Sequence, residues 1–339
     1  MFLQLKENYW VKLIGDPHLG KKFINGVPLN RRGERESQQM DRFYQELMGV
    51  TFKADPNTTS MVQDVIVMGD LFDQFHVSNE VLLQTYSSIR RAADNNPMVH
   101  YYILMGNHDV SRNTELVSSF QILKTMFSII ENISFITEIQ SIGLLGHEEY
   151  LLMCPYEAFT PTKDLKIKTD RRYLAAFGHW DTQSFGDEHN LLPYEPLSKV
   201  TDLIVTGHEH NAREFMYDPQ TKVIVTGSML PYSHAEDPEG NIYVTVELHK
   251  FLQEPDQYHN KALRLLLKPG DELPENIDAM QVTFKFVTED QEEEIQVELE
   301  DFSMKNVFDT VMRENEVPEN TSALYWNKYQ EKDSDAASA

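Results

Sequence analysis

Cysteine is nearly absent from this chain of 339 residues, because Cys154 is the only one. A single cysteine excludes an internal disulfide and the paired-cysteine zinc clusters, and it favours a reducing compartment. The chain also lacks the run of about eighteen apolar residues that a membrane span needs, and its first residues lack a basic region followed by an apolar one. We therefore expect a cytoplasmic protein with no membrane contact.

Positive charge is scarce as well. The 30 lysines and arginines face 54 aspartates and glutamates, which gives a formal net charge of -24. The summed field of such a chain repels nucleic acid and other polyanions. A polyanionic substrate therefore needs divalent ions in the site, a local basic surface, or a more basic partner subunit. Local basic pairs do exist, notably Lys21 with Lys22, although such pairs are ordinarily a solvated surface.

Apolar runs rich in β-forming residues recur up to about residue 248, in a chain that is 41% hydrophobic. The strand candidates are 9–14, 64–68, 99–105, 150–153, 174–177, 203–205, 223–225 and 242–248. Segments with helical spacing, at 37–50, 79–93 and 114–130, alternate with the early strands or follow them. This alternation indicates an α/β domain. Because several strand candidates are continuously apolar, we expect sheets covered on both faces.

A polar motif follows each of five strand candidates. The motifs are GDPHLG after KLI, GDLFD after VIVM, GNHD after YYILM, GHW after LAAF, and GHEH after LIVT. In layered α/β folds, ligands bind in the crevice beyond the carboxyl ends of the strands, where separate loops converge. Each motif contains glycine, which lets the backbone turn sharply beneath a ligand. We therefore expect the five loops to form one site.

The side chains in these loops are oxygen and imidazole ligands, which suit a catalytic metal centre. Asp16 and His18 are two residues apart, a spacing that directs both side chains toward one ion, and His208 and His210 repeat it. Asp70 has two carboxylate oxygens and can therefore bridge two ions. The remaining candidates are Asn107, through its carbonyl oxygen, and His179.

In this order, the motifs DxH, GDxxD, GNHD, GH and GHxH resemble the calcineurin-like metallophosphoesterase family over roughly residues 1–248. The resemblance implies an α/β fold in which a double β-sheet sandwich is flanked by helices, and it implies a pair of divalent ions. By position in the motifs, the first ion binds Asp16, His18, Asp70 and His210. The second ion binds Asp70, Asn107, His179 and His208.

The same resemblance makes His108 the catalytic histidine, placed to protonate the leaving oxygen, with Asp73 as its carboxylate partner. A carboxylate hydrogen-bonded to one ring nitrogen fixes the tautomer and raises the basicity of the ring, which suits a general acid near neutral pH. Two ions about 3.5 to 4 Å apart would activate a bridging water for in-line attack on phosphorus. The reaction then needs no protein nucleophile.

Residues around the motifs resemble one branch of the family, the SbcD-type DNA repair nucleases. These features are HLG after the first ligand, the Leu-Phe pair in GDLFD, Trp180 after GH, and GSMLPYS at 227–233. The branch implies a double-strand exonuclease and single-strand endonuclease that uses manganese, with magnesium as the alternative. It also implies two partners, DNA and an SbcC-like coiled-coil ATPase, and a nuclease homodimer within a heterotetrameric repair and recombination complex.

On this basis we divide the chain into four parts. Residues 1–250 form the nuclease domain, 260–300 a small α+β capping domain, 301–327 a helical segment that binds the ATPase, and 328–339 a disordered tail. The chain departs from the usual pattern at Pro17, which stiffens the loop between the first two ligands. Its short C-terminal region suggests a bacteriophage or small bacterial version, in which case the compartment is the host cytoplasm.

Two other functions remain open. The same metal core serves phosphatases and cyclic-nucleotide phosphodiesterases, and hydrolysis of small phosphoesters without action on DNA would indicate one of these. A non-catalytic metal-binding scaffold of an ATPase complex is the other alternative. His108 argues against the scaffold, because a scaffold has no need of a general acid. Family resemblance alone does not decide among these functions.

Overall fold

The computed structural model describes residues 1–55, 58–111, 113, 116–144, 148–167, 171–184, 188–274 and 277–287. The predicted partner-binding segment at 301–327 and the predicted tail at 328–339 lie outside these residues, as does the end of the predicted capping domain. Among the residues described, no helix is long and apolar enough to cross a membrane.

The first sheet has five strands in the order β1-β2-β5-β6-β7. They are β1 (Phe2–Lys6), β2 (Tyr9–Ile14), β5 (Asp64–Val67), β6 (His100–Leu104) and β7 (Ile133–Ile136). All neighbours pair in parallel except β1, which runs antiparallel to β2 at the edge. The ends of the parallel strands are in register, since Ile14 pairs with Val67 and Val67 with Ile103. The loops that follow β2, β5 and β6 therefore leave the sheet at one edge.

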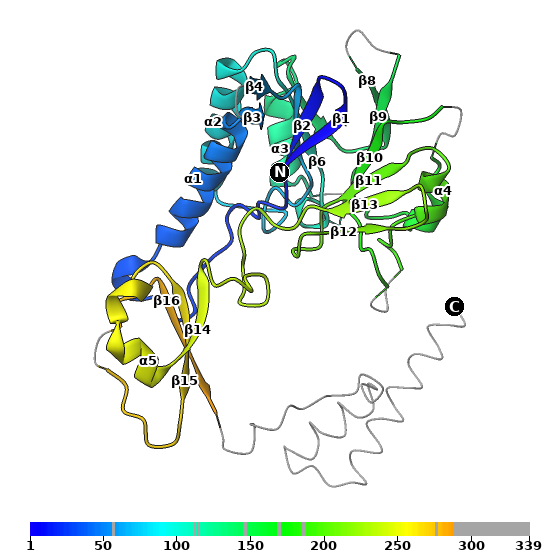
Figure 1. The fold of residues 1–339 in the computed structure, drawn as a ribbon. Coiled ribbons are helices and arrows are strands. Elements are labelled where there is room, and N and C mark those ends of the chain that lie inside the picture. The colour runs from blue at the N-terminus through cyan, green and yellow to red at the C-terminus, as the bar shows by residue number, and fades with distance from the viewer. Residues whose placement is uncertain are drawn as a thin grey trace, which may run out of the picture. The chain divides into compact units, whose positions relative to one another are not determined.

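The second sheet has six strands in the order β12-β13-β11-β10-β9-β8. They are β8 (Gln140–Gly143), β9 (Tyr150–Cys154), β10 (Ala175–Gly178), β11 (Leu203–Thr206), β12 (Arg213–Met216) and β13 (Lys222–Val225). The four central strands are parallel, and the two edge strands are antiparallel to their neighbours. Figure 1 shows this sheet as the green group of strands beside the blue and cyan first sheet.

The two sheets pack face to face around one apolar core. Buried side chains from both sheets meet there, including Leu13 and Ile66 from the first and Leu151, Phe177 and Val205 from the second. The long helices α1 (Glu34–Met48), α2 (Asn79–Asn95) and α3 (Ser119–Met126) cover the outer face of the first sheet, and the short α4 (Tyr194–Ser198) packs on the second. The predicted fold, a double α/β sandwich flanked by helices, is confirmed.

A small sheet follows the sandwich. It consists of β14 (Tyr243–Glu247), β15 (Ala262–Leu267) and β16 (Gln281–Phe286), and α5 (Leu248–Gln253) packs on it through an apolar cluster of its own. β14 pairs in parallel with β15. The strand predicted at 242–248 was placed in the nuclease domain, whereas its hydrogen bonds are with the strand that follows. The boundary drawn at residue 250 stays a prediction.

Several short elements were not predicted. They are the β3 (Thr51–Asp55) and β4 (Thr58–Met61) hairpin, strands β1, β7, β8 and β12, the short helices α4 and α5, and the 3-10 helices η1 (Leu29–Arg31), η2 (Asn107–Asp109), η3 (Thr162–Asp164) and η4 (Pro255–Tyr258). The helix predicted at 114–130 is shorter than expected, because Ser118 caps it and it ends at Met126. A serine side chain that accepts a hydrogen bond from the first turn is a strong start signal.

Candidate metal centre

The five polar motifs converge at the carboxyl ends of five parallel strands, three in the first sheet and two in the second. The backbone at three of the predicted ligands is strained. His18, Asp70 and His208 have φ angles of 46°, 47° and 72°, a left-handed conformation that residues with a Cβ rarely adopt. Such strain is kept where the surrounding structure over-determines a functional position. The loops thus hold these side chains in directions that an extended chain would not give them.

Two glycines allow the loops to lie against one another. A Cβ on Gly69 would lie 2.2 Å from Nδ1 of His179, and a Cβ on Gly106 would lie 2.1 Å from the amide nitrogen of Asp70. Both distances are far below contact distance, so only glycine fits at these positions. The Asp70 loop therefore sits directly between the His179 loop and the Asn107 loop.

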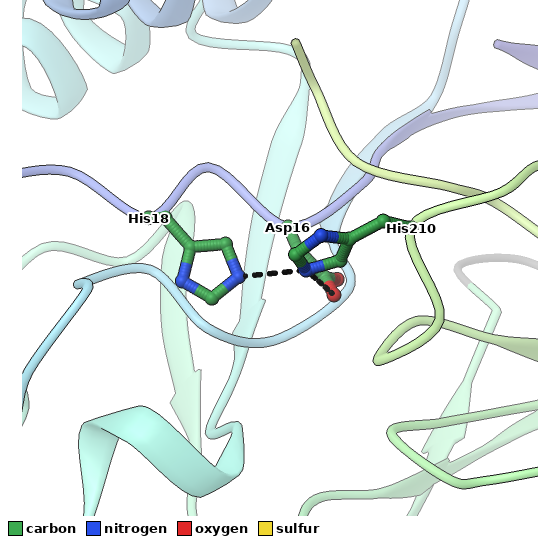
Figure 2. A group of neighbouring side chains, drawn as sticks. All are labelled: Asp16, His18 and His210. Carbon is green, nitrogen blue, oxygen red and sulfur yellow. Dashed lines mark hydrogen bonds and ion pairs between the residues drawn. The ribbon is translucent and has the colours of Figure 1, made fainter. Parts of the chain in front are cut away.

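The first ligand cluster consists of Asp16, His18 and His210, drawn in Figure 2. Nε2 of His18 lies 3.1 Å from Nε2 of His210, which lies 4.0 Å from Oδ2 of Asp16. Both carboxylate oxygens of Asp16 are buried and, within the part of the chain described, have no hydrogen-bond partner. An unpartnered buried carboxylate is costly unless a cation offsets its charge. These residues therefore fit a divalent ion.

The second ligand cluster is built around Asn107. Its Oδ1 lies 2.9 Å from Nε2 of His179 and 2.9 Å from Nδ1 of His208. Oδ2 of Asp70 is 3.4 Å from Nε2 of His179 and 3.6 Å from Nε2 of His18, so it faces both clusters. One carboxylate oxygen between two groups of ligands is the arrangement that a bridging ligand requires.

The pKa values of His179 and Asp70, which face each other in the second cluster, shift in opposite directions. Burial alone would lower the pKa of His179, yet the facing carboxylates of Asp70 and Asp16 raise it to about 10. Burial would raise the pKa of Asp70, but the facing imidazoles, His179 foremost, bring it below its usual range. Both shifts favour the charged forms, an imidazolium that faces a carboxylate. A divalent ion at these atoms would require neutral His179, so we expect metal binding to release protons.

Each histidine of the two clusters turns its other ring nitrogen toward an oxygen. The pairs are His179 Nδ1 with the Met68 carbonyl at 2.9 Å, His208 Nε2 with Asp181 at 2.9 Å, His210 Nδ1 with Glu236 at 3.4 Å, and His18 Nδ1 with Asp73 at 3.6 Å. Hydrogen bonds of this kind fix the tautomer of a metal-binding histidine and raise its basicity. Nδ1 of His18 is the exception, since it is buried and has no hydrogen-bond partner among the described residues. Asp181 and Glu236 were missed by sequence reasoning, although Asp181 follows the GHW motif directly.

His108 lies at the edge of the ligand clusters, where it forms a third group of potential ligand atoms with His18 and Asp70. Its side chain is 43% exposed, and Nε2 lies 4.0 Å from Oδ2 of Asp70. Nδ1 donates to the backbone carbonyl of Asp73 at 2.6 Å, which leaves Nε2 directed at the ligands. His108 therefore contacts Asp73 through its backbone carbonyl and not through the carboxylate that we expected, and the catalytic role of the pair stays a prediction. The Asp73 carboxylate instead accepts from Lys21 Nζ at 3.1 Å and faces His18.

Asp109 ties two of the loops together. Its buried carboxylate accepts three backbone N–H groups, from Leu71 at 3.1 Å, Phe72 at 3.0 Å and Gly106 at 2.9 Å. Both oxygens are engaged by the backbone, so the residue supports the loops rather than the ligand clusters. The Asp109 carboxylate thus joins the loop that carries Asp70 to the loop that carries Asn107.

A depression of about 520 Å³ lies beside His108 and is open to solvent. Its walls include Lys21, Gln74 and Phe75, together with Asn107 and His108. A second depression, of about 360 Å³, shares Lys21 and Gln74 with it and extends toward Lys22 and His76. A phosphoester can therefore approach the ligand clusters from the side on which His108 is exposed.

Comparison with known proteins agrees with this geometry. A model of the calcineurin-like phosphoesterase family matches residues 9–212. The chain belongs to the calcineurin-like phosphoesterase family. Calcineurin-like phosphoesterases are metal-dependent phosphoester hydrolases that bind two divalent ions, and the two clusters around Asp70 are suited to hold such ions.

The chain is also similar to one curated protein. It is the DNA double-strand break repair protein Mre11 of Sulfolobus acidocaldarius, which is 24% identical over 230 residues. The match covers 63% of this chain and 53% of the relative, so this calcineurin-like phosphoesterase spans about half the length of that protein.

Proposed function

We propose that this phosphoesterase is the nuclease subunit of an SbcD-type DNA repair and recombination complex, with manganese as its metal. The first ion is held by Asp16, His18, Asp70 and His210. The second is held by Asp70, Asn107, His179 and His208. One observation carries the proposal: Oδ2 of Asp70 faces both clusters, and the exposed His108 lies beside it.

A pair of divalent ions supplies the activation of water and the stabilisation of charge on phosphorus. The protein's own groups do the rest. Asp70 keeps the two clusters together, and its Oδ1 accepts the backbone N–H of His108 at 2.9 Å, which fixes the histidine against the ligands. The Asp73 carbonyl holds the proton on Nδ1, so Nε2 is the nitrogen that donates a proton to the leaving oxygen.

DNA, rather than a small phosphoester, is supported by the surroundings of the site. The depressions beside His108 are open and extend past Lys21 and Lys22, which suits a chain of phosphates better than an enclosed ligand. The relative from Sulfolobus is a DNA double-strand break repair protein by name. The net charge of -24 fits a complex in which a partner supplies much of the phosphate neutralisation.

The direct test is digestion of DNA by the purified chain with Mn²⁺. We expect shortening of linear double-stranded DNA and cleavage of single-stranded DNA, both lost in Asp70→Ala and His108→Ala variants purified in the same way. Hydrolysis of nucleotide monoesters or cyclic nucleotides with DNA left intact, even in the presence of an SbcC-like ATPase, would contradict the proposal and favour a phosphatase or cyclic-nucleotide phosphodiesterase.

The proposed partner is the SbcC-like coiled-coil ATPase, bound by the segment at 301–327, which lies outside the described residues. The ATPase would grip DNA and bring it to the site. A chain truncated after Glu300 should keep hydrolysis of small diesters and fail to co-purify with the ATPase. Co-purification of the truncated chain would place the binding surface elsewhere.

A homodimer within that complex is supported by an apolar stripe on and beside α3. Ile122, Met126 and Ile129 lie at helical spacing and are 36%, 37% and 85% exposed, and Val117 just before the helix is 57% exposed. Exposed apolar side chains in one stripe mark an interaction surface. A second copy of the chain is the proposed occupant, because an isologous contact buries the same stripe on both subunits.

The dimer is tested with Ile122→Glu and Met126→Glu. A buried carboxylate without a partner opposes association, so we expect the wild-type chain to sediment as a dimer and the variants as monomers. Met216→Glu is the matched control, since Met216 is an exposed methionine on β12 of the second sheet. A wild-type monomer at every accessible concentration, or variants that remain dimeric, would contradict the assignment.

A further inference from the structure

The segment that follows the last ligand packs against the first ligand cluster through Tyr232. The phenol hydroxyl donates to the carbonyl of Pro17 at 2.5 Å and lies 3.2 Å from the carbonyl of Asp16. Pro17 stands between the ligands Asp16 and His18 and has no N–H of its own, so only its carbonyl can form a backbone hydrogen bond. The Tyr232 hydroxyl provides that bond, beside the bond from the His18 N–H to the Asp70 carbonyl at 2.9 Å.

The ring of Tyr232 also restricts both imidazoles of the cluster. Its centroid lies 5.3 Å from the His18 ring and 5.6 Å from the His210 ring, in edge-on arrangements of 86° and 63°. Edge-on aromatic pairs at these distances are attractive and directional. The same residue thus contacts the backbone of one ligand and the rings of two others.

Glu236, in the same segment, reinforces this contact. Its Oε2 accepts the backbone N–H of Tyr232 at 2.8 Å and faces Nδ1 of His210 at 3.4 Å. On the other side, the buried amide of Gln39 donates to the carbonyls of Pro17 and His18, both at 3.0 Å. The first ligand loop is therefore held from α1 and from the segment that contains Tyr232.

A chain of hydrogen bonds joins Tyr232 to the small sheet. Tyr243, on β14, donates its hydroxyl to the backbone carbonyl of Tyr232 at 2.6 Å. Arg35 in turn donates to the Tyr243 hydroxyl at 2.6 Å and to Gln281 on β16 at 2.6 Å. The Arg35 guanidinium is buried and lies 3.8 Å from the ring centroid of Phe23. A donor chain of this kind is polarised along its length, and each bond strengthens the next.

We propose that Tyr232 is a positioning residue for the first ion, and that Tyr243 couples its position to the docking of the small sheet. Loss of either hydroxyl lets the loop from Asp16 to His18 relax. The affinity of the first cluster for its ion then falls, while the affinity of the second cluster is unchanged. The proposal rests on the assignment of Asp16, His18 and His210 to one ion. It does not depend on the substrate.

Metal affinity in single-site backgrounds tests it without any substrate. His208→Ala removes a ligand of the second cluster only, and Asp16→Ala a ligand of the first only. Binding of Mn²⁺ is followed by the electron paramagnetic resonance signal of the free ion. In the His208→Ala background we expect Tyr232→Phe to weaken binding about tenfold, as for other groups that orient metal ligands. Tyr243→Phe should weaken it about threefold, the effect of losing one neutral hydrogen bond.

In the Asp16→Ala background the same substitutions should leave Mn²⁺ affinity unchanged. Tyr258→Phe, which removes a hydroxyl from a tyrosine that packs on Phe251 in the small sheet's own cluster, is the matched control and should change neither background. Thermal melting in chelator establishes that every variant is folded.

Equal affinities with and without the Tyr232 hydroxyl, or equal losses in both backgrounds, would overturn the proposal. If Tyr232→Phe does not fold, the result for Tyr243→Phe decides alone. A negative result for Tyr232 and Tyr243 does not bear on the proposed nuclease function, which the digestion of DNA tests separately.

Discussion

Asp70→Asn is expected to lower kcat/KM for phosphodiester hydrolysis by about 10⁴-fold or more, because the variant loses the one charged oxygen that faces both clusters. Oδ2 of Asp70 lies within 3.6 Å of the nearest imidazole nitrogen of each cluster. An asparagine in its place has a neutral carbonyl oxygen, and the like-charged ions would then face each other without a carboxylate between them. The measurement is steady-state hydrolysis of a nitrophenyl phosphodiester with Mn²⁺.

Asp94→Asn is the control for that substitution, since Asp94 is an exposed residue of α2 that pairs with Arg90. It should keep the wild-type rate. Metal content completes the test: the Asp70 variant should retain fewer than two ions per chain. A variant that keeps both ions and more than about a tenth of the activity would show that Asp70 does not bridge, since bridging places it on both ions at once.

His108→Ala is expected to separate proton donation from metal binding. General acid catalysis contributes about 10²- to 10⁴-fold when the leaving group needs a proton, and little when it does not. We therefore expect a loss of about 10³-fold on DNA, whose leaving group is a sugar hydroxyl, and tenfold or less on a nitrophenyl diester. Affinity for Mn²⁺ should stay unchanged, because His108 belongs to neither of the two proposed ligand sets and its side chain is 43% exposed.

The leaving-group comparison is what distinguishes an acid from a structural residue. His249→Ala, at an exposed position of α5, is the control and should leave both substrates unaffected. Equal losses on DNA and on the nitrophenyl diester would mean that His108 holds the site together or binds the phosphate. In that case the proton donor would have to be another group in the depression beside it.

The ligand residues could be predicted because their placement is local. Each follows a buried strand by one to a few residues, and parallel strands in register place their following loops at one edge. The structure brings together the residues predicted for each ion, Asn107 included, around Asp70. Their assignment to metal remains a prediction, but their convergence is a property of the fold.

The supporting residues could not be predicted in the same way. Tyr232 acts on Pro17 across more than two hundred positions of sequence, and Glu236 reaches His210 only because the intervening segment folds back. Asp73 does contact His108, yet spacing alone does not say whether its carbonyl or its carboxylate makes the contact. Short edge strands such as β12, with its exposed Met216, carry too few apolar residues to be recognised before their partners are known.

Anomalous diffraction from crystals grown with Mn²⁺ tests the central claim most directly. We expect two manganese peaks about 3.5 to 4 Å apart. One should lie among Asp16, His18 and His210, the other among Asn107, His179 and His208, with Asp70 bound to both. A single peak that stays single at saturating Mn²⁺, or two peaks that do not share Asp70, would contradict the account.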